Sequence, residues 1–194
     1  MDKAYLEEMK KQKGEGRGMN IKSMFDYTYQ KFGEVGVKKV EKQMADWGYP
    51  VLRSKVKPMS FHPLFMNYLF VAAVQESFNL NKKQLMEMGA IMFKFNLFTK
   101  LFMKYFVSLD MITEQVPKMF GKHYTVGTVK MVKYDMKKRY AIFHEYFKVD
   151  QRHSDIHHGY IVKAAEMIMK KPITSEQTKN VFKGDPYNEY ILKW

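Results

Sequence analysis

The chain of 194 residues contains no cysteine. This absence excludes disulfide bonds, thiolate nucleophiles and cysteine metal sites, and it favours a reducing compartment, so we expect a cytoplasmic protein. Acidic residues are also scarce, because 33 lysines and arginines face only 20 aspartates and glutamates, which gives a formal net charge of +13. Such an excess attracts anions such as nucleic acid, acidic lipid or an acidic protein partner. The basic residues are spread along the chain, however, and we interpret their densest run, Lys130–Arg139, as part of a solvated strand pair.

A long uninterrupted hydrophobic run is missing as well. Residues 1–18 are charged throughout and do not resemble a signal peptide. The one uncharged run that raises the membrane question, Pro58–Gln75, is broken by polar residues, and a helix beginning at Pro63 would be too short to span a bilayer. We therefore predict no membrane span. The hydrophobic share of 46% and the aromatic share of 15% exclude general disorder.

Helical periodicity dominates the first part of the chain, after a charged N-terminal arm at residues 1–18. The longest predicted helix begins at its cap Asn81 and extends to Leu109, with methionine, phenylalanine and leucine on nearly all sides. It is either a plain core helix or one whose Met- and Phe-rich side lines a small-molecule cavity, since methionine forms adaptable apolar walls. The other helices are predicted at 23–32, 34–47, 63–78 and 110–120.

The periodicity changes from helical to alternating after Gly121. Strands are predicted at 125–134 and 139–148, then a helix from its cap Ser154 to Lys170, then strands at 173–182 and 187–194. Both faces of the strand at 139–148 are largely apolar, which predicts cover on both sides. The order indicates an α+β fold in which an N-terminal helical cap precedes a hairpin–helix–hairpin antiparallel four-stranded sheet. Residues 19–194 are expected to form one domain.

The closing run, residues 180–190 (Asn-Val-Phe-Lys-Gly-Asp-Pro-Tyr-Asn-Glu-Tyr), resembles the C-terminal signature of the 4-vinyl-reductase-type small-molecule-binding domains. These share a superfamily with the haem nitric-oxide-binding domains and the TRAPP vesicle-tethering subunits. Three further segments are similar in order and spacing, namely Leu80–Gly89, Val116–Gly127 and the pair Gly159-Tyr160. The resemblance spans residues 19–194 and implies a ligand-binding or sensory domain that pairs as a homodimer and signals to a separate protein.

Two departures from the family pattern limit its cofactors. The zinc-holding cysteines of the vinyl-reductase type are replaced by Asn180 and Asn188, so the resemblance implies no zinc here. We expect the turn between these asparagines to be held by hydrogen bonds and packing, and the two side chains to contact each other. No cofactor is predicted.

Haem is the less favoured ligand for a similar reason. The haem branch needs an axial histidine in the helix before the first strand, where this chain has Met119 and Phe120, with His123 predicted beyond Gly121 in the loop. The Tyr-x-Ser-x-Arg propionate clamp of that branch is also missing after Tyr134.

No catalytic set emerges from the sequence, so we lean towards a protein that is not an enzyme. His153 and His157 can share a helix face and suit a metal, but solvation at a helix start is the favoured interpretation. The leading hypothesis is a non-catalytic domain that holds an apolar or aromatic molecule between helical cap and sheet. The predicted walls of the site are Met92, Phe95, Phe120, Tyr146 and Tyr160, and its predicted polar anchors are His123 and His144.

Two alternatives from other classes stay open. A basic interaction module would dock nucleic acid or an acidic protein, with an affinity that falls steeply with salt. An enzyme acting on hydrophobic acyl or vinyl compounds has only the family name in its favour.

Overall fold

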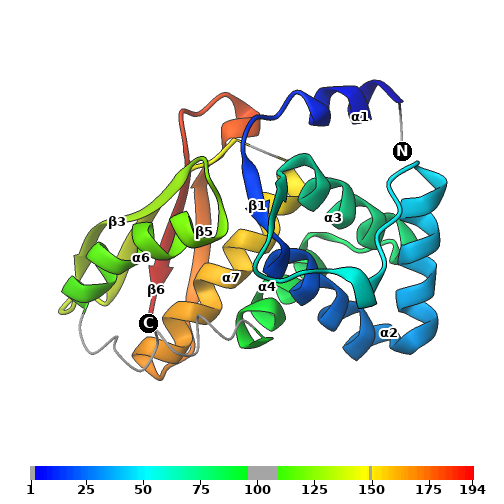
Figure 1. The fold of residues 1–194 in the computed structure, drawn as a ribbon. Helices are drawn as coiled ribbons and strands as arrows, with labels where there is room; N and C mark the ends of the chain where they lie inside the picture. Colours follow the sequence, from blue (N-terminus) through cyan, green and yellow to red (C-terminus); the bar gives the residue numbers. More distant parts are fainter. Residues whose placement is uncertain (1–2, 96–108, 149) are drawn as a thin grey trace.

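The computed structural model describes residues 3–95, 109–148 and 150–194, and a helical half precedes a half built around a sheet (Figure 1). The helical half contains α1 (Lys3–Lys10), β1 (Glu15–Arg17), α2 (Gly18–Asp46), η1 (Arg53–Lys55), β2 (Phe61–Pro63), α3 (Phe65–Phe78) and α4 (Lys82–Phe95). The second half contains α6 (Leu109–His123), β3 (Thr128–Asp135), β4 (Tyr140–Tyr146), α7 (Gln151–Met169), β5 (Thr174–Lys179), η2 (Val181–Lys183) and β6 (Asn188–Lys193). The predicted α+β fold, with a helical cap followed by hairpin, helix and hairpin, is confirmed.

The four-stranded sheet is antiparallel with the order β3-β4-β6-β5, so the two hairpins join through β4 and β6. Helices α6 and α7 lie against the same face of this sheet (Figure 1). Along β4 the residues Ala141, Phe143 and Glu145 are buried on that face, whereas Tyr146 on the other face is 42% exposed. The prediction that both faces are covered is therefore wrong. The sheet has one covered face and one open face, and the open face carries Ile142 and Ile191 as well as aromatic side chains beside lysines.

The helical half differs from the prediction at three boundaries. The two helices predicted on either side of Gly33 form one helix, α2, with a kink at this residue, whose φ of 65° is accessible to glycine. Pro63 does not begin a helix, because Phe61–Pro63 pairs with Glu15–Arg17 as β2 with β1. The N-terminal residues thus join the fold, and Met9 is buried in the helical core.

The helix predicted from Asn81 to Leu109 begins as expected. Asn81 Oδ1 accepts from the Gln84 backbone N–H at 3.0 Å, and Gln84 Oε1 accepts from the Asn81 N–H at 2.9 Å, which is a capping box. Helix α4 extends to Phe95, and the rest of the predicted helix, residues 96–108, lies outside the described residues.

Helices α4 and α7 cross with their backbones in contact, and two glycines make this possible. A Cβ on Gly89 would lie 1.9 Å from the Ile156 carbonyl oxygen, and a Cβ on Gly159 would lie 1.9 Å from that of Met86. These glycines belong to two of the segments that carry the family resemblance. Their role is to let α7 approach the helical cap closely, which brings the cap to the sheet.

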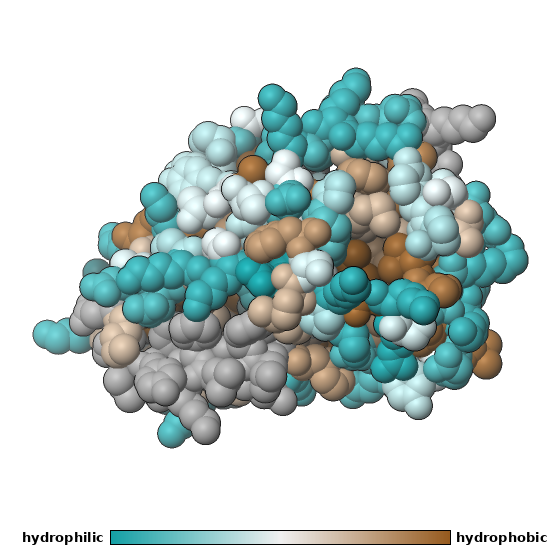
Figure 2. All heavy atoms as spheres, in the orientation of Figure 1, coloured by the Kyte–Doolittle hydropathy of each residue, from teal (hydrophilic) through white to brown (hydrophobic). Residues whose placement is uncertain are grey.

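The surface seen in the same view is mostly hydrophilic, and its hydrophobic residues gather mainly over the helical half (Figure 2). In the described part of the chain, no helix is both long and apolar enough to cross a membrane.

Candidate functional site

A cavity of about 150 Å³ lies between α6, the covered face of the sheet, α7 and the end of α4. Most of its wall is aliphatic or aromatic. The apolar side chains come from every surrounding element, for example Met92, Ile112, Phe143, Ala165 and Trp194. A pocket with an apolar wall and a few polar groups is typical of small-molecule sites.

The polar side chains of the cavity gather at one end, where α6 ends and α7 begins. They are Asn20, His123, Tyr124, His153, His157 and Tyr160. The other end, beside the last turns of α7 and the C-terminal residues, is lined by apolar side chains such as Ile168, Met169 and Trp194. The site therefore has a polar end and an apolar end.

Four of the predicted site residues line this cavity: Met92, Phe120, His123 and Tyr160. His123 does not lie in a loop as predicted, because α6 continues through Gly121 and ends at His123. The structure thus brings residues from α4, α6 and α7 together around one space. That they bind a ligand stays a prediction.

The other three predicted residues lie elsewhere. Phe95, the last residue of α4, is 42% exposed and does not line the cavity. His144 and Tyr146 point to the open face of the sheet, where His144 Nε2 lies 2.7 Å from Glu189 Oε2 and the His144 ring stacks on Tyr187. As predicted, these two residues share one face of the strand. That face is the open one, however, and not the face that lines the cavity. The period of two along a strand cannot by itself tell which face the helices cover.

A chain of hydrogen bonds closes the polar end. The Tyr124 hydroxyl lies 3.0 Å from His153 Nε2 and 3.1 Å from His157 Nε2, and His157 Nδ1 lies 2.5 Å from Glu145 Oε1. A carboxylate only accepts, so His157 donates to Glu145 from Nδ1. With one proton on each imidazole, His157 accepts from Tyr124 at Nε2, and His153 donates to Tyr124 from its own Nε2.

Glu145 anchors the far end of the chain and is 0% exposed. Its Oε2 accepts from Asn188 Nδ2 and from the Tyr190 hydroxyl, each at 2.9 Å. Ser154 Oγ accepts from Asn188 Nδ2 at 3.0 Å and donates to the Tyr190 hydroxyl, also at 3.0 Å. Every oxygen of this buried carboxylate is thus matched by a donor, as a buried charge requires.

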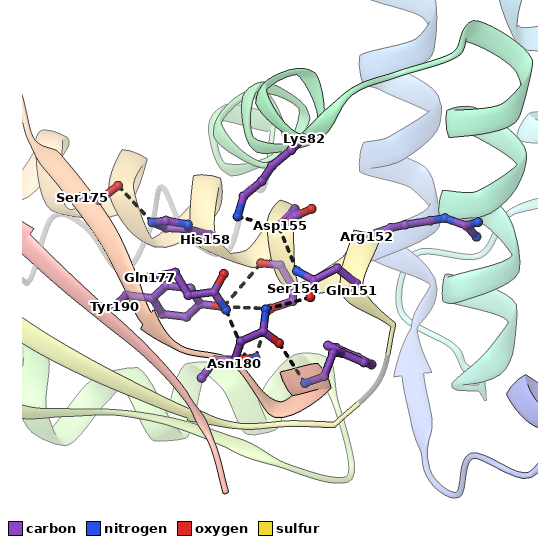
Figure 3. Close-up of polar contacts among 12 residues, drawn as sticks. Lys82, Gln151, Arg152, Ser154, Asp155, His158, Ser175, Gln177, Asn180 and Tyr190 are labelled. Carbon is purple, nitrogen blue, oxygen red and sulfur yellow. Dashed lines mark hydrogen bonds and ion pairs between the residues drawn. The ribbon is translucent and has the colours of Figure 1, made fainter. Parts of the chain in front are cut away.

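The two asparagines at the cysteine positions of the family do not contact each other as predicted. Asn188 is fully satisfied, because its Oδ1 accepts from the Val181 N–H and from Gln177 Nε2 in addition to the two bonds that its Nδ2 donates. Asn180 instead accepts from the Phe182 N–H and donates to Gln151 Oε1 at the start of α7 (Figure 3). The turn is held by hydrogen bonds, as expected, but each asparagine bonds to different partners.

The start of α7 also differs from the prediction. Asp150, not Ser154, caps the helix, since its side chain accepts from the Arg152 N–H. Ser154 is buried one turn inside the helix and faces Tyr190 (Figure 3). The interpretation of His153 and His157 as solvated residues of a helix start is therefore wrong, because His153 is only 2% exposed.

Burial disfavours the charged forms of several groups at the polar end. Desolvation lowers the pKa of His153 well below its usual value and lowers that of His123 to about 4. The same cause raises the pKa of Tyr124 and of Tyr190 well above the ordinary value of a phenol. At neutral pH the imidazoles of His123 and His153 and the hydroxyls of Tyr124 and Tyr190 are therefore neutral.

Two buried nitrogens of the cavity residues have no hydrogen-bond partner in the described part of the chain. They are Nδ2 of Asn20 and Nδ1 of His153. Sequence reasoning missed Asn20 and Glu145, because a single polar residue in a helix or strand carries no signal of its surroundings. The spacing of four between His153 and His157 was the one available signal, and it suggested a metal. Within residues 3–95, 109–148 and 150–194 no group of three or more metal-ligating side chains occurs.

No protein-family model matches the sequence, and no curated protein matches it. Solved structures do match. An unliganded Fe(II) H-NOX protein mutant from K. algicida superposes with a TM-score of 0.65 at 14% identity, covering 91% of this chain and 95% of that one. An oxygen-binding H-NOX domain related to soluble guanylate cyclases, in its oxygen complex, has a TM-score of 0.59 at 15% identity, covering 91% and 94%. A Cs H-NOX mutant has a TM-score of 0.64 at 16% identity, covering 91% of this chain and 95% of that one.

These likenesses show the fold and confirm the predicted relationship in architecture to the haem nitric-oxide-binding domains. They do not concern the vinyl-reductase type, which stays a prediction.

Proposed function

We propose that this chain is a sensory domain that holds one small apolar or aromatic molecule in the cavity between α6, α7 and the sheet. The observation that supports this most directly is the cavity itself, about 150 Å³ with a mostly apolar wall. An engineered cavity of about this size in another protein binds benzene. The space therefore suits a ligand with a single ring or a short branched chain.

The fold supports a sensor over an enzyme. Solved domains of this architecture include one described as oxygen binding and related to soluble guanylate cyclases. The buried tyrosine of the cavity is poorly suited to nucleophilic chemistry, because desolvation raises the pKa of Tyr124 and both imidazoles already bond to its hydroxyl. We propose binding without catalysis.

Haem is the other candidate ligand that the fold suggests, since two of the similar structures concern haem redox potential and haem distortion. His123 ends the helix before the first strand and lines the cavity, contrary to the predicted loop position, so the missing axial histidine no longer counts against haem. The described residues fit haem poorly in two other respects. The cavity matches one ring rather than a tetrapyrrole, and no lysine or arginine among the described lining residues is present to pair with two propionates. An absorbance band between 400 and 450 nm in the purified protein would reverse this conclusion.

Native mass spectrometry and thermal shift test the proposal, with a panel of single-ring compounds, phenols, lipids and tetrapyrroles. We expect a single-ring compound to raise the melting temperature of the protein. Ala165→Leu adds three carbons to the cavity wall and should abolish this shift. Met167→Leu, on the same helix but outside the lining, should retain it. No retained molecule and no shift across the panel would refute the proposal.

A second candidate function uses the open face of the sheet. Lysine side chains lie over exposed or half-buried rings there, with Lys130 Nζ 5.9 Å from the centre of Tyr146 and Lys179 Nζ 4.6 Å from that of Tyr187. Aromatic rings beside lysines favour single-stranded nucleic acid, whose bases stack on rings. Binding of an oligonucleotide that weakens steeply between 50 and 200 mM salt, and is lost in Tyr146→Ala, would support this candidate.

Pairing as a homodimer and signalling to a separate protein remain proposals from the family resemblance. Sedimentation equilibrium of the purified chain tests the first.

A further inference from the structure

We infer that the cavity selects a neutral molecule with a small apolar body and one carbonyl-type acceptor, which Asn20 binds. The inference rests on the proposed function and deepens it, because it names the chemical class of the ligand. It is carried by the unsatisfied amide of Asn20, by the absence of charge in the described lining, and by the fixed hydrogen bonds of the other polar groups.

Asn20 comes from the first turns of α2 and meets the end of α6. The residue is 7% exposed, and its Oδ1 lies 3.1 Å from His123 Nδ1. This bond uses the acceptor of the amide and leaves its donor, Nδ2, buried and without a partner in the described part of the chain. A buried donor that stays unpaired is costly, so a ligand that supplies an acceptor gains affinity that an apolar ligand cannot.

The ligand must be neutral because the described lining contains no lysine, arginine, aspartate or glutamate. A carboxylate or an ammonium group placed in this cavity would lose its water without gaining an opposite charge. His123 and His153 do not change this, since burial lowers the pKa of His123 to about 4 and that of His153 well below its usual value. Acids and amines are therefore excluded in favour of aldehydes, ketones and comparable acceptors.

The remaining polar groups leave little choice of donor for that acceptor. The proton of the Tyr124 hydroxyl is directed to His157 Nε2, and the Nε2 proton of His153 is directed to Tyr124. The other nitrogen of His153, Nδ1, carries no proton in this arrangement and only accepts. Among Asn20, Tyr124, His153 and His157, Asn20 is thus the residue that offers unused N–H groups to a ligand.

Ligands with one ring and different substituents provide the test. We expect benzaldehyde to bind the intact protein about tenfold more tightly than toluene, as the value of one satisfied buried donor implies. Benzoate and benzylamine should bind more weakly than either. Isothermal titration measures the four affinities, and the infrared carbonyl stretch of bound benzaldehyde should move to the lower frequency of a hydrogen-bonded carbonyl.

The variant Asn20→Leu should remove the advantage of benzaldehyde and keep the binding of toluene. Met136→Leu, an exposed residue of the turn between β3 and β4, serves as the control and should keep the tenfold ratio. The ratio of the benzaldehyde and toluene affinities in the intact protein tests the carbonyl inference even where Asn20→Leu fails to fold. Benzyl alcohol is titrated as a fifth compound. Equal binding of toluene and benzaldehyde, or tighter binding of benzyl alcohol than of benzaldehyde, would overturn the carbonyl inference and leave the apolar cavity standing. Binding of none of these compounds would overturn the proposed function with it.

Discussion

The close crossing of α4 and α7 makes a quantitative prediction for Gly159→Ala. The new Cβ would lie 1.9 Å from the Met86 carbonyl oxygen, about 1.5 Å short of the 3.4 Å at which ordinary contact begins. The obstacle is backbone within a helix, so it cannot rotate away, and the two helices must separate. Overpacking of this kind costs about 3 kcal/mol or more. For a chain of this length such a loss lowers the melting temperature by roughly 6–12 °C.

The matched control is Gly121→Ala in α6. No atom lies within 4 Å of the position that its Cβ would take, and its backbone is helical, so alanine should stabilise the helix by up to about 1 kcal/mol. Both variants add one methyl group to a helical glycine near the cavity, and only the contact differs.

Urea denaturation followed by circular dichroism measures both variants, and the single-ring ligands supply a second readout. The edge contact between Phe93 and Tyr160, at 4.9 Å between ring centres, joins the two helices beside the cavity. Separation of the helices should therefore also weaken ligand binding in Gly159→Ala. A Gly159→Ala protein as stable as Gly121→Ala would refute the close crossing, and with it the shape of the cavity.

Three further predictions concern other parts of the molecule. Glu145→Gln should lower the free energy of unfolding by about 3 kcal/mol in urea denaturation, because an amide nitrogen then faces a buried donor. A loss below about 0.5 kcal/mol would contradict the hydrogen bonds assigned to Glu145. Burial lowers the pKa of His158 to about 4, so the unfolded chain binds a proton that the fold does not, and stability should fall as pH drops from 6.5 to 4. In that interval His158→Gln should flatten the slope of stability against pH by up to about 1.4 kcal/mol per unit, which acid titration of the urea midpoint measures. Asn81→Ala should cost about 1 kcal/mol by the same denaturation assay, since it removes the cap of α4, whereas an unchanged midpoint would show that the cap is dispensable.

The sequence predicted the succession of elements well because each relies on local signals. The alternation at 139–148 and the helix cap at Asn81 are legible within a few residues, and both appear in the structure. The pairing of Glu15–Arg17 with Phe61–Pro63 is a contact between segments far apart in the chain, and no local pattern announces it.

The candidate site was predicted in part for the same reason. Residues on the helices, such as Met92 and Phe120, were placed correctly, because helical periodicity shows which side is apolar. For β4 the sequence offered two largely apolar faces. Whether the face with Glu145 or the face with His144 turns inward depends on where α6 and α7 pack. The place of α7 depends in part on its glycine crossing with α4, which the sequence marks only by two glycines seventy residues apart.

The comparison with known folds sharpens the question of the ligand without answering it. More than nine-tenths of the chain superposes on H-NOX domains at about 15% identity, so the architecture is shared while most side chains differ. A ligand is recognised by side chains, and those at the described polar end are imidazoles, hydroxyls and an amide. Asn20 brings an unused donor, and Tyr124 is held between two imidazoles. The proposed ligand, a small polar acceptor on an apolar body, is complementary to such a set. The described lining offers no lysine or arginine to the propionates of a tetrapyrrole, so the proposal follows the lining and not the likeness in fold.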